Sequence, residues 1–299
     1  MHPLRMNAPG VNPALPKNLN HWGTQTMGKA WLGQIMHWWN IAKELSPRQV
    51  ERELLTPFRI ALVGQPDRVE AVWRVLTAGA SPQTQQTASE YVKRFTGPPQ
   101  EEFDMVLACD ALEVPQDAIE AIVEHFQKHE FPLVALARIL PGTREMVVNR
   151  LIEDVATLNA GIAMLSAVPS VFPLLGLLAP PAAVADMVVL TKNQLLMVLR
   201  VAAAYGKAPD WRRRLPELAS VLGAAFGWRA VARELVGFVP GGVGMVVKGM
   251  VAYAGTLTVG RAAAWYYATG RTPGRAERER LYQQAWEEAR EKSQEWNKP

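Results

Sequence analysis

The chain has 299 residues, of which 49% are hydrophobic and 20% are charged, and its formal net charge at pH 7 is +4. This composition excludes a disordered chain, and the mild charge without a dominant basic segment argues against a nucleic-acid-binding protein. The single cysteine, Cys109, excludes an internal disulfide framework and suits a reducing compartment.

Residues 1–56 are expected to form an N-terminal tail followed by an amphipathic helix. The tail has no charged-then-apolar signal sequence, so we expect a cytoplasmic protein. The apolar residues at helical spacing are Trp31, Ile35, Trp38, Ala42 and Leu45, with Trp39 beside them. The pattern favours a helix docked on the body of the protein. The alternative is a membrane-surface anchor in which Trp31, Trp38 and Trp39 contact lipid, because tryptophan prefers the headgroup level.

Residues 57–170 alternate short apolar runs with helical patterns, which predicts an α/β region built on a small parallel sheet. The predicted strands are Arg59–Val63, Phe103–Cys109, Leu133–Leu136 and Ile162–Leu165. The predicted helices cover residues 67–78, 115–129 and 142–158. The polar connection Gly79–Glu90 is a place where a switch-like loop would fit.

The stretch "ALVGQPDRVEAV", residues 61–72, has the strand–glycine–helix order of a phosphate-binding loop. A working loop has the pattern GxxxxGK[ST], but here Val69 replaces the second glycine, Glu70 the lysine and Ala71 the Ser/Thr. Because those groups hold the phosphates and Mg²⁺, a loop that starts at Gly64 without them should bind neither GTP nor ATP. Asp110, at the end of a predicted strand, is expected to cap that strand end, the alternative being a magnesium-linked aspartate.

Residues 171–270 are apolar and nearly free of acidic side chains, which predicts a hydrophobic helical domain. Segments 171–190 and 236–260 are each long enough to cross a bilayer, at roughly 20 apolar residues. Prolines and glycines interrupt both of them, so buried helices of a bundle explain the composition as well as a membrane hairpin does.

Three polar residues stand out in this apolar zone: Asp186, Gln194 and Arg200. A structural polar network is the favoured interpretation, and a lipid- or partner-binding polar site is the alternative. The basic run Arg212, Arg213 and Arg214 follows Trp211. It suits contact with anionic headgroups and a solvated loop equally well.

The remaining features favour structural roles. Residues 271–299 alternate charges of opposite sign over a helical pattern, which predicts a charged surface helix carrying Leu281, Ala285 and Ala289. His125 and His129 are four residues apart, but no third ligand accompanies them, so we expect no metal site. Cys109 is expected to be a buried, inert thiol.

The segments "RIALVGQPD", "FDMVLACDA", "FPLVALARIL" and "AMLSAV" together resemble a degenerate Era/TrmE-type GTPase domain. The resemblance places Ser166–Ala167 at the family's last guanine-loop motif. It places Ala137–Leu140 where the guanine-reading NKxD motif stands, and there no residue accepts hydrogen bonds from the base.

The segments "PLLGLLAPPAAVADMVVLTKNQLLMVLRVAAAYG" (Pro173–Gly206) and "VPGGVGMVVKGMVAYAGTLTVGRAAAWYYATG" (Val239–Gly270) resemble the YcjF-like helical domain of unknown function, which is often fused behind such GTPases. The residues that carry this resemblance are Asp186, Gln194, Tyr205, Gly206, Pro240, Gly241, Thr256 and Gly260. Relatives in this family are described as membrane-associated.

These observations predict an α/β plus all-α protein, in which a degenerate GTPase-like domain over residues 57–170 precedes a YcjF-like domain over 171–270 and a charged helix over 271–299. The expected function is that of a non-catalytic pseudo-GTPase scaffold without a cofactor. Its expected partners are a protein, an anionic membrane surface or a second copy, and not nucleic acid. The alternatives are a divergent GTP-binding protein and an integral protein of the inner membrane with a hydrophobic hairpin.

Overall fold

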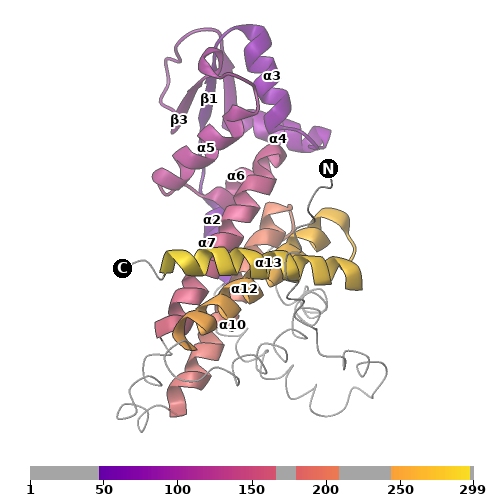
Figure 1. Cartoon of the computed structure of the whole chain (residues 1–299). Coiled ribbons are helices and arrows are strands. Elements are labelled where there is room, and N and C mark those ends of the chain that lie inside the picture. The colour runs from indigo at the N-terminus through magenta and orange to yellow at the C-terminus, as the bar shows by residue number, and fades with distance from the viewer. Residues whose placement is uncertain (1–46, 166–179, 209–243, 297–299) are drawn as a thin grey trace, which may run out of the picture. The chain divides into compact units, whose positions relative to one another are not determined.

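The computed structural model describes residues 47–165, 180–208 and 244–296 (Figure 1). Several sequence-based predictions lie outside the described residues: those on Trp31, Trp38 and Trp39, on Arg212–Arg214, on Ser166–Ala167 and on the side chain of Asp186. All of the described residues belong to one compact unit, which spans residues 42–299. The described part of the chain is mostly helical and contains a small parallel sheet, so the expected α/β plus helical class is confirmed.

The sheet has three parallel strands in the order β2-β1-β3. They are β1 (Ile60–Val63), β2 (Val92–Phe95) and β3 (Met105–Ala108), and Ile60 lies opposite both Val92 and Met105. Ile60, Ala61 and Leu62 are fully buried, because β1 has a strand on each side. The chain reaches β2 from β1 through α3 (Pro66–Leu76) and α4 (Pro82–Tyr91). After β3 come a short 3₁₀ turn, Cys109–Ala111, and α5 (Asp117–Lys128).

Two predicted strands are wrong. Leu133–Leu136 belongs to α6 (Leu133–Ile139), and Ile162–Leu165 is the end of α7 (Arg144–Leu165). Both segments are short apolar runs whose periodicity does not separate a buried strand from a buried helix, and both are rich in Ala and Leu, which favour helix. The sheet therefore ends at β3, and no strand end exists at Ala137–Leu140 to present a guanine-reading motif.

The polar connection Gly79–Glu90 is mostly helical as well. Ser81 is the N-cap residue of α4, and its hydroxyl oxygen accepts a hydrogen bond from the backbone N–H of Thr84 at 3.2 Å, while Pro82 occupies the first helical position. Serine followed by proline is a recognised helix start, so this helix could have been found from the sequence. The strand β2, "VKRF", was missed because it has four residues and two of them are charged.

The rest of the described chain consists of long helices that pack against one another (Figure 1). They are α7, α10 (Pro180–Ala204), α12 (Gly244–Thr269) and α13 (Arg275–Trp296), and a short helix α2 (Pro47–Leu55) contacts α6 and α10. Gly249 lies against Met164 and Gly260 against Ile152, so α12 runs antiparallel to α7. The helices predicted in the apolar zone and near the C-terminus are confirmed for these ranges. Ala285 and Ala289 are fully buried in α13.

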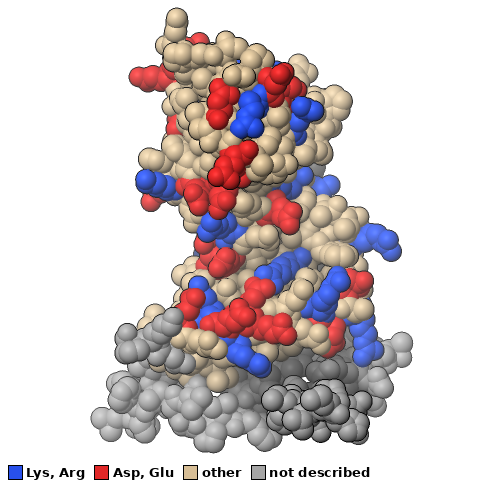
Figure 2. Space-filling model, turned by 45° about the horizontal axis from the view of Figure 1, so that its top comes forward, with Lys and Arg blue, Asp and Glu red and all other residues tan. Residues whose placement is uncertain are grey.

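None of the helices in the described ranges is both long enough and apolar enough to cross a membrane. On the face shown in Figure 2, Lys and Arg side chains alternate with Asp and Glu side chains. This surface therefore carries no single-sign patch of the kind that binds nucleic acid through its phosphates.

Candidate functional site

The candidate phosphate loop begins where β1 ends, at Gly64. This residue has φ +154°, and its backbone N–H donates to the carbonyl oxygen of Phe95 at 3.1 Å. An ideal Cβ at this position would lie 2.8 Å from Oδ1 of Asp110. Glycine is therefore required twice, by the positive φ and by the close approach of a carboxylate.

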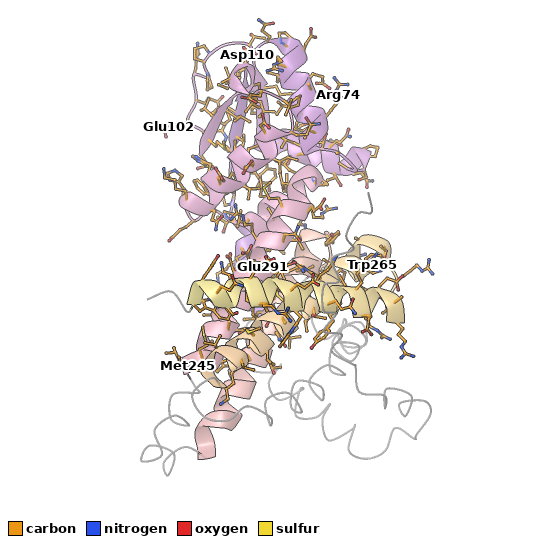
Figure 3. The ribbon with its side chains drawn as sticks, viewed as in Figure 1. Arg74, Glu102, Asp110, Met245, Trp265 and Glu291 are labelled. Atoms are coloured by element: carbon orange, nitrogen blue, oxygen red, sulfur yellow. The ribbon has the colours of Figure 1, made fainter. Side chains whose placement is uncertain are left out.

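The carboxylate of Asp110 occupies the start of α3 (Figure 3). Its Oδ1 and Oδ2 lie 3.0 and 3.1 Å from the backbone nitrogen of Gln65, which donates to them as the N-cap residue of the helix. A helix N-terminus carries partial positive charge and unpaired N–H groups, which makes it the place where a nucleotide phosphate would bind. In this protein a side chain from the end of β3 already supplies an anion there.

Val69, Glu70 and Ala71, which replace the motif's glycine, lysine and Ser/Thr, lie in different surroundings on α3. Val69 is buried in the core, and Ala71 is half-buried. The Glu70 carboxylate lies 3.1 Å from Nη1 of Arg94 on β2, and this guanidinium stands 4.8 Å above the ring of Trp73. Repulsion of a phosphate by Glu70, expected from the sequence, is therefore weakened by its ion pair. Asp110, in contrast, bonds directly to the loop at the backbone N–H of Gln65.

A second set of polar residues meets between α7, α10 and α12. The hydroxyl oxygen of Thr256 accepts hydrogen bonds from the amide groups of Asn159 at 3.0 Å and Gln194 at 3.1 Å. Asn193 donates to the side-chain oxygen of Asn159 at 2.9 Å. Thr256, Asn159 and Gln194 are each at most 5% exposed, so these bonds satisfy amides that burial would otherwise penalise. Asn159 and Asn193 were missed from sequence, although an asparagine on the buried side of an apolar helix is the signal.

Arg200 does not join this network, although it lies only six residues after Gln194. Its Nε and Nη2 lie 2.9 and 2.5 Å from the two carboxylate oxygens of Glu53 on α2. The structure thus gives Gln194 and Arg200 separate partners, and the two do not form a common polar site. The third member of the predicted site, Asp186, has no described side chain.

Several residues that carry the resemblance to the helical domain have packing roles. Gly206, with φ +77°, ends α10, and the backbone nitrogens of Gly206 and Lys207 donate back to Ala203 and Ala202. The Tyr205 ring stacks on Tyr267 at 6.4 Å and faces the guanidinium of Arg144 at 5.0 Å. These contacts fix helix ends and spacing, and they present no reactive group.

Cys109 lies in the core, whereas His125 on α5 is half-buried and His129, at the end of that helix, is exposed. Cys109 is 1% exposed, as predicted, and burial raises the pKa of its thiol. His125 and His129 have ring centroids 4.4 Å apart, and Nε2 of His125 lies 2.9 Å from the carbonyl oxygen of Asp104. The described residues contain no group of three or more His, Cys, Asp or Glu side chains that could hold a metal ion.

One cavity of about 470 Å³ lies between α7, α12 and α13. Its lining is Asn149, Ile152, Glu153, Leu257, Arg261, Gln284, Glu287, Glu288 and Glu291. Arg261 forms a two-point ion pair with Glu288 at 2.9 and 2.7 Å, so part of the acidic charge is neutralised inside the cavity itself. No local sequence pattern marks this cavity, because three separate helices supply its walls.

Comparison of the chain with protein-family models, curated proteins and solved structures gave no match.

Proposed function

We propose that this chain is a non-catalytic scaffold whose α/β part is a degenerate, Era/TrmE-like GTPase domain and whose YcjF-like helical part offers a surface to a partner. The observation that carries the proposal is the carboxylate of Asp110 bonded to the N-cap residue of α3. An internal anion at this position competes with a phosphate for the same N–H group and repels it electrostatically.

The surroundings of the loop support the same conclusion. Pro66 has no backbone N–H to offer a phosphate, and no lysine stands at the position of Glu70. Arg68, the nearest basic side chain in the sequence, donates to the carbonyl oxygen of Leu112. A nucleotide would therefore have to displace Asp110 without gaining a cation in exchange.

Isothermal titration of the full chain with millimolar GTP or ATP and Mg²⁺ tests the proposal. We expect no saturable heat from either nucleotide. Saturable binding by the wild type would overturn the proposal, and its loss in Glu70→Ala or Asp110→Ala would place the nucleotide at this loop. Asp117→Ala is the matched control, since Asp117 also caps a nearby backbone N–H, that of Val114 at 3.0 Å.

The membrane-surface version of the scaffold depends on Trp31, Trp38, Trp39 and Arg212–Arg214, all outside the described residues. Flotation of the full chain with anionic and neutral liposomes tests it. Binding to anionic vesicles alone is the expected result for an electrostatic headgroup contact. If the chain floats with neither kind of liposome, the expected partner of the scaffold is a protein rather than a membrane.

A further inference from the structure

The outer edge of β3 offers unpaired backbone groups. The N–H of Met105 donates to the carbonyl oxygen of Arg59 at 3.3 Å, so Met105 and Leu107 direct their backbone groups toward β1. In a parallel ladder alternate residues bond to opposite sides, which turns the N–H and C=O groups of Val106 and Ala108 outward. No hydrogen bond from the described part of the chain engages them.

The side chains of this edge are apolar. Met105 and Leu107 are buried, whereas Val106 is 54% exposed and Ala108 is also exposed. The opposite edge differs, because β2 exposes Lys93 and Arg94, and charged side chains are a common device against edge-to-edge pairing. Figure 1 shows β3 on the side of the sheet away from α3.

Acidic side chains flank the apolar edge at both ends. Asp104 and Glu102 precede β3, Asp110 and Glu113 follow it, and all four are exposed. The carboxylates of Asp104 and Asp110 accept hydrogen bonds from the backbone of Arg59 and Gln65, so Glu102 and Glu113 are the acidic groups that a partner would meet. Figure 3 shows Glu102 on the same side of the sheet as β3. A strand with basic residues at its ends would complement this arrangement.

A second copy of the chain fits this edge less well. If the outward residues of two β3 strands paired antiparallel as Val106 with Ala108, Asp104 would lie opposite Asp110 of the other copy. If Val106 instead paired with itself, Glu102 would lie opposite Asp110. In the third register, Ala108 with itself, Val106 would lie opposite Asp110. Residues 96–127 contain no Lys or Arg, so a second copy would bring more acidic residues and no cation to the ends of β3 in any of these registers.

We propose that the outer edge of β3 binds an extended segment of a partner protein as a fourth strand, apolar in its centre and carrying Lys or Arg at its ends. The bound strand would exchange backbone hydrogen bonds with Val106 and Ala108 and cover the exposed Val106 side chain. The inference rests on the proposed scaffold function, for which it names the partner's chemistry. It does not depend on the state of the nucleotide loop.

A labelled peptide with the sequence Lys-Val-Thr-Val-Thr-Val-Lys, titrated into the full chain by fluorescence anisotropy, tests the proposal. We expect saturable binding that weakens with added salt and amide hydrogen exchange that slows at Val106 and Ala108. Val106→Lys and Val106→Pro should each weaken binding by about tenfold or more, because the first adds a charge and the second removes the outward N–H. Two variants are used so that a folding defect in one does not decide the outcome.

Val114→Lys is the matched control, because Val114 is a similarly exposed valine, at 49%, outside the strand. It should leave binding unchanged, and a peptide ending in Glu should not bind. The absence of saturable binding, or equal binding by the wild type and both Val106 variants, overturns the proposal. A dimer in sedimentation that Val106→Lys dissociates also overturns it, in favour of a second copy. In either case the nucleotide titration still stands as the separate test of the scaffold.

Discussion

Gly260 of α12 lies so close to Ile152 of α7 that an ideal Cβ on the glycine would be 2.6 Å from Cγ2 of the isoleucine. Ile152 is 1% exposed, and its Cγ1 would lie 2.7 Å from the same Cβ, so both branches of the isoleucine side chain stand in the way. The backbone of α12 at Gly260 therefore packs directly against the Ile152 side chain of α7. A larger residue at position 260 would require α7 or this side chain to move.

Gly260→Ala should destabilise the protein even though alanine is the better helix former. We expect a net loss of about 1–2 kcal/mol in the free energy of unfolding, since overpacking outweighs the gain in propensity. Gly161→Ala in α7 is the control, because no atom lies within 4 Å of its ideal Cβ. That variant should be stabilised by about 0.5–1 kcal/mol. Urea unfolding of both variants measures the difference, and equal effects would contradict the close approach.

Thr256→Val should also destabilise the protein, by about 1–3 kcal/mol, because it leaves buried amide donors without their acceptor. The donors concerned are those of Asn159 and Gln194. Thr258→Val is a matched control: Thr258 is buried too, but its hydroxyl donates to the carbonyl of Ala254 within the same helix at 2.8 Å. Thermal unfolding should separate the two variants clearly. If Thr256→Val were as stable as Thr258→Val, the network would not be contributing.

Cys109 should react slowly with thiol reagents in the folded protein. Burial excludes the reagent and raises the pKa of the thiol, so little of the nucleophilic thiolate is present near neutral pH. With a disulfide reagent at pH 8 we expect a rate at least about 100-fold below that of the urea-unfolded chain, because the reaction requires local opening. A native rate close to the unfolded rate would show that the thiol is accessible.

Tyr253 should make stability depend on pH in the alkaline range. Burial, followed by the charges of Glu153 and Glu288, raises its pKa from 10.0 to about 12. The phenol is protonated in both states below pH 10, so its contribution is complete there. Between pH 10 and 12 the unfolded chain loses this proton first, and stability falls as the pH rises toward the folded pKa.

The expected loss at pH 11, one unit above the pKa of the unfolded chain, is about 1.4 kcal/mol, because each pKa unit corresponds to about 1.4 kcal/mol. Urea unfolding of the wild type and of Tyr253→Phe at pH 8 and at pH 11 measures it. The variant lacks the titrating group, so the wild type should lose this stability relative to the variant between pH 8 and pH 11. A difference that does not change with pH would contradict the raised pKa.

The elements predicted correctly are those whose local signals agree with their surroundings. The apolar run before Gly64 and the helix after it follow the same local preferences that form β1 and α3 in the structure. The helix α6 could not be separated from a strand, because all of Val134, Ala135, Leu136 and Ala137 are buried and no polar face reveals the period. The helix packs against α2 and α10, which are distant in sequence, and a local pattern does not contain these contacts.

In the candidate sites, too, local motifs could be predicted from the sequence, whereas contacts between distant residues could not. The missing lysine and glycine of the loop were evident from the sequence, because that motif is local. The hydrogen bond from Gln65 to Asp110 joins residues 45 positions apart, and no spacing rule connects them. The ion pair between Arg200 and Glu53, which are 147 positions apart, could not be predicted from sequence spacing either.

The helix α7 has 22 residues and contacts α5 and α6 as well as α10 and α12. Val147 and Val148 in its first half and Ala160 and Ala163 in its second half are all buried. A fragment cut after residue 170 would therefore carry away a helix that the remaining bundle needs, and it would expose the half that the bundle had covered. Because α7 packs against both the α/β part and the helical bundle, the two parts should unfold together. Calorimetry should then show a single thermal transition rather than two.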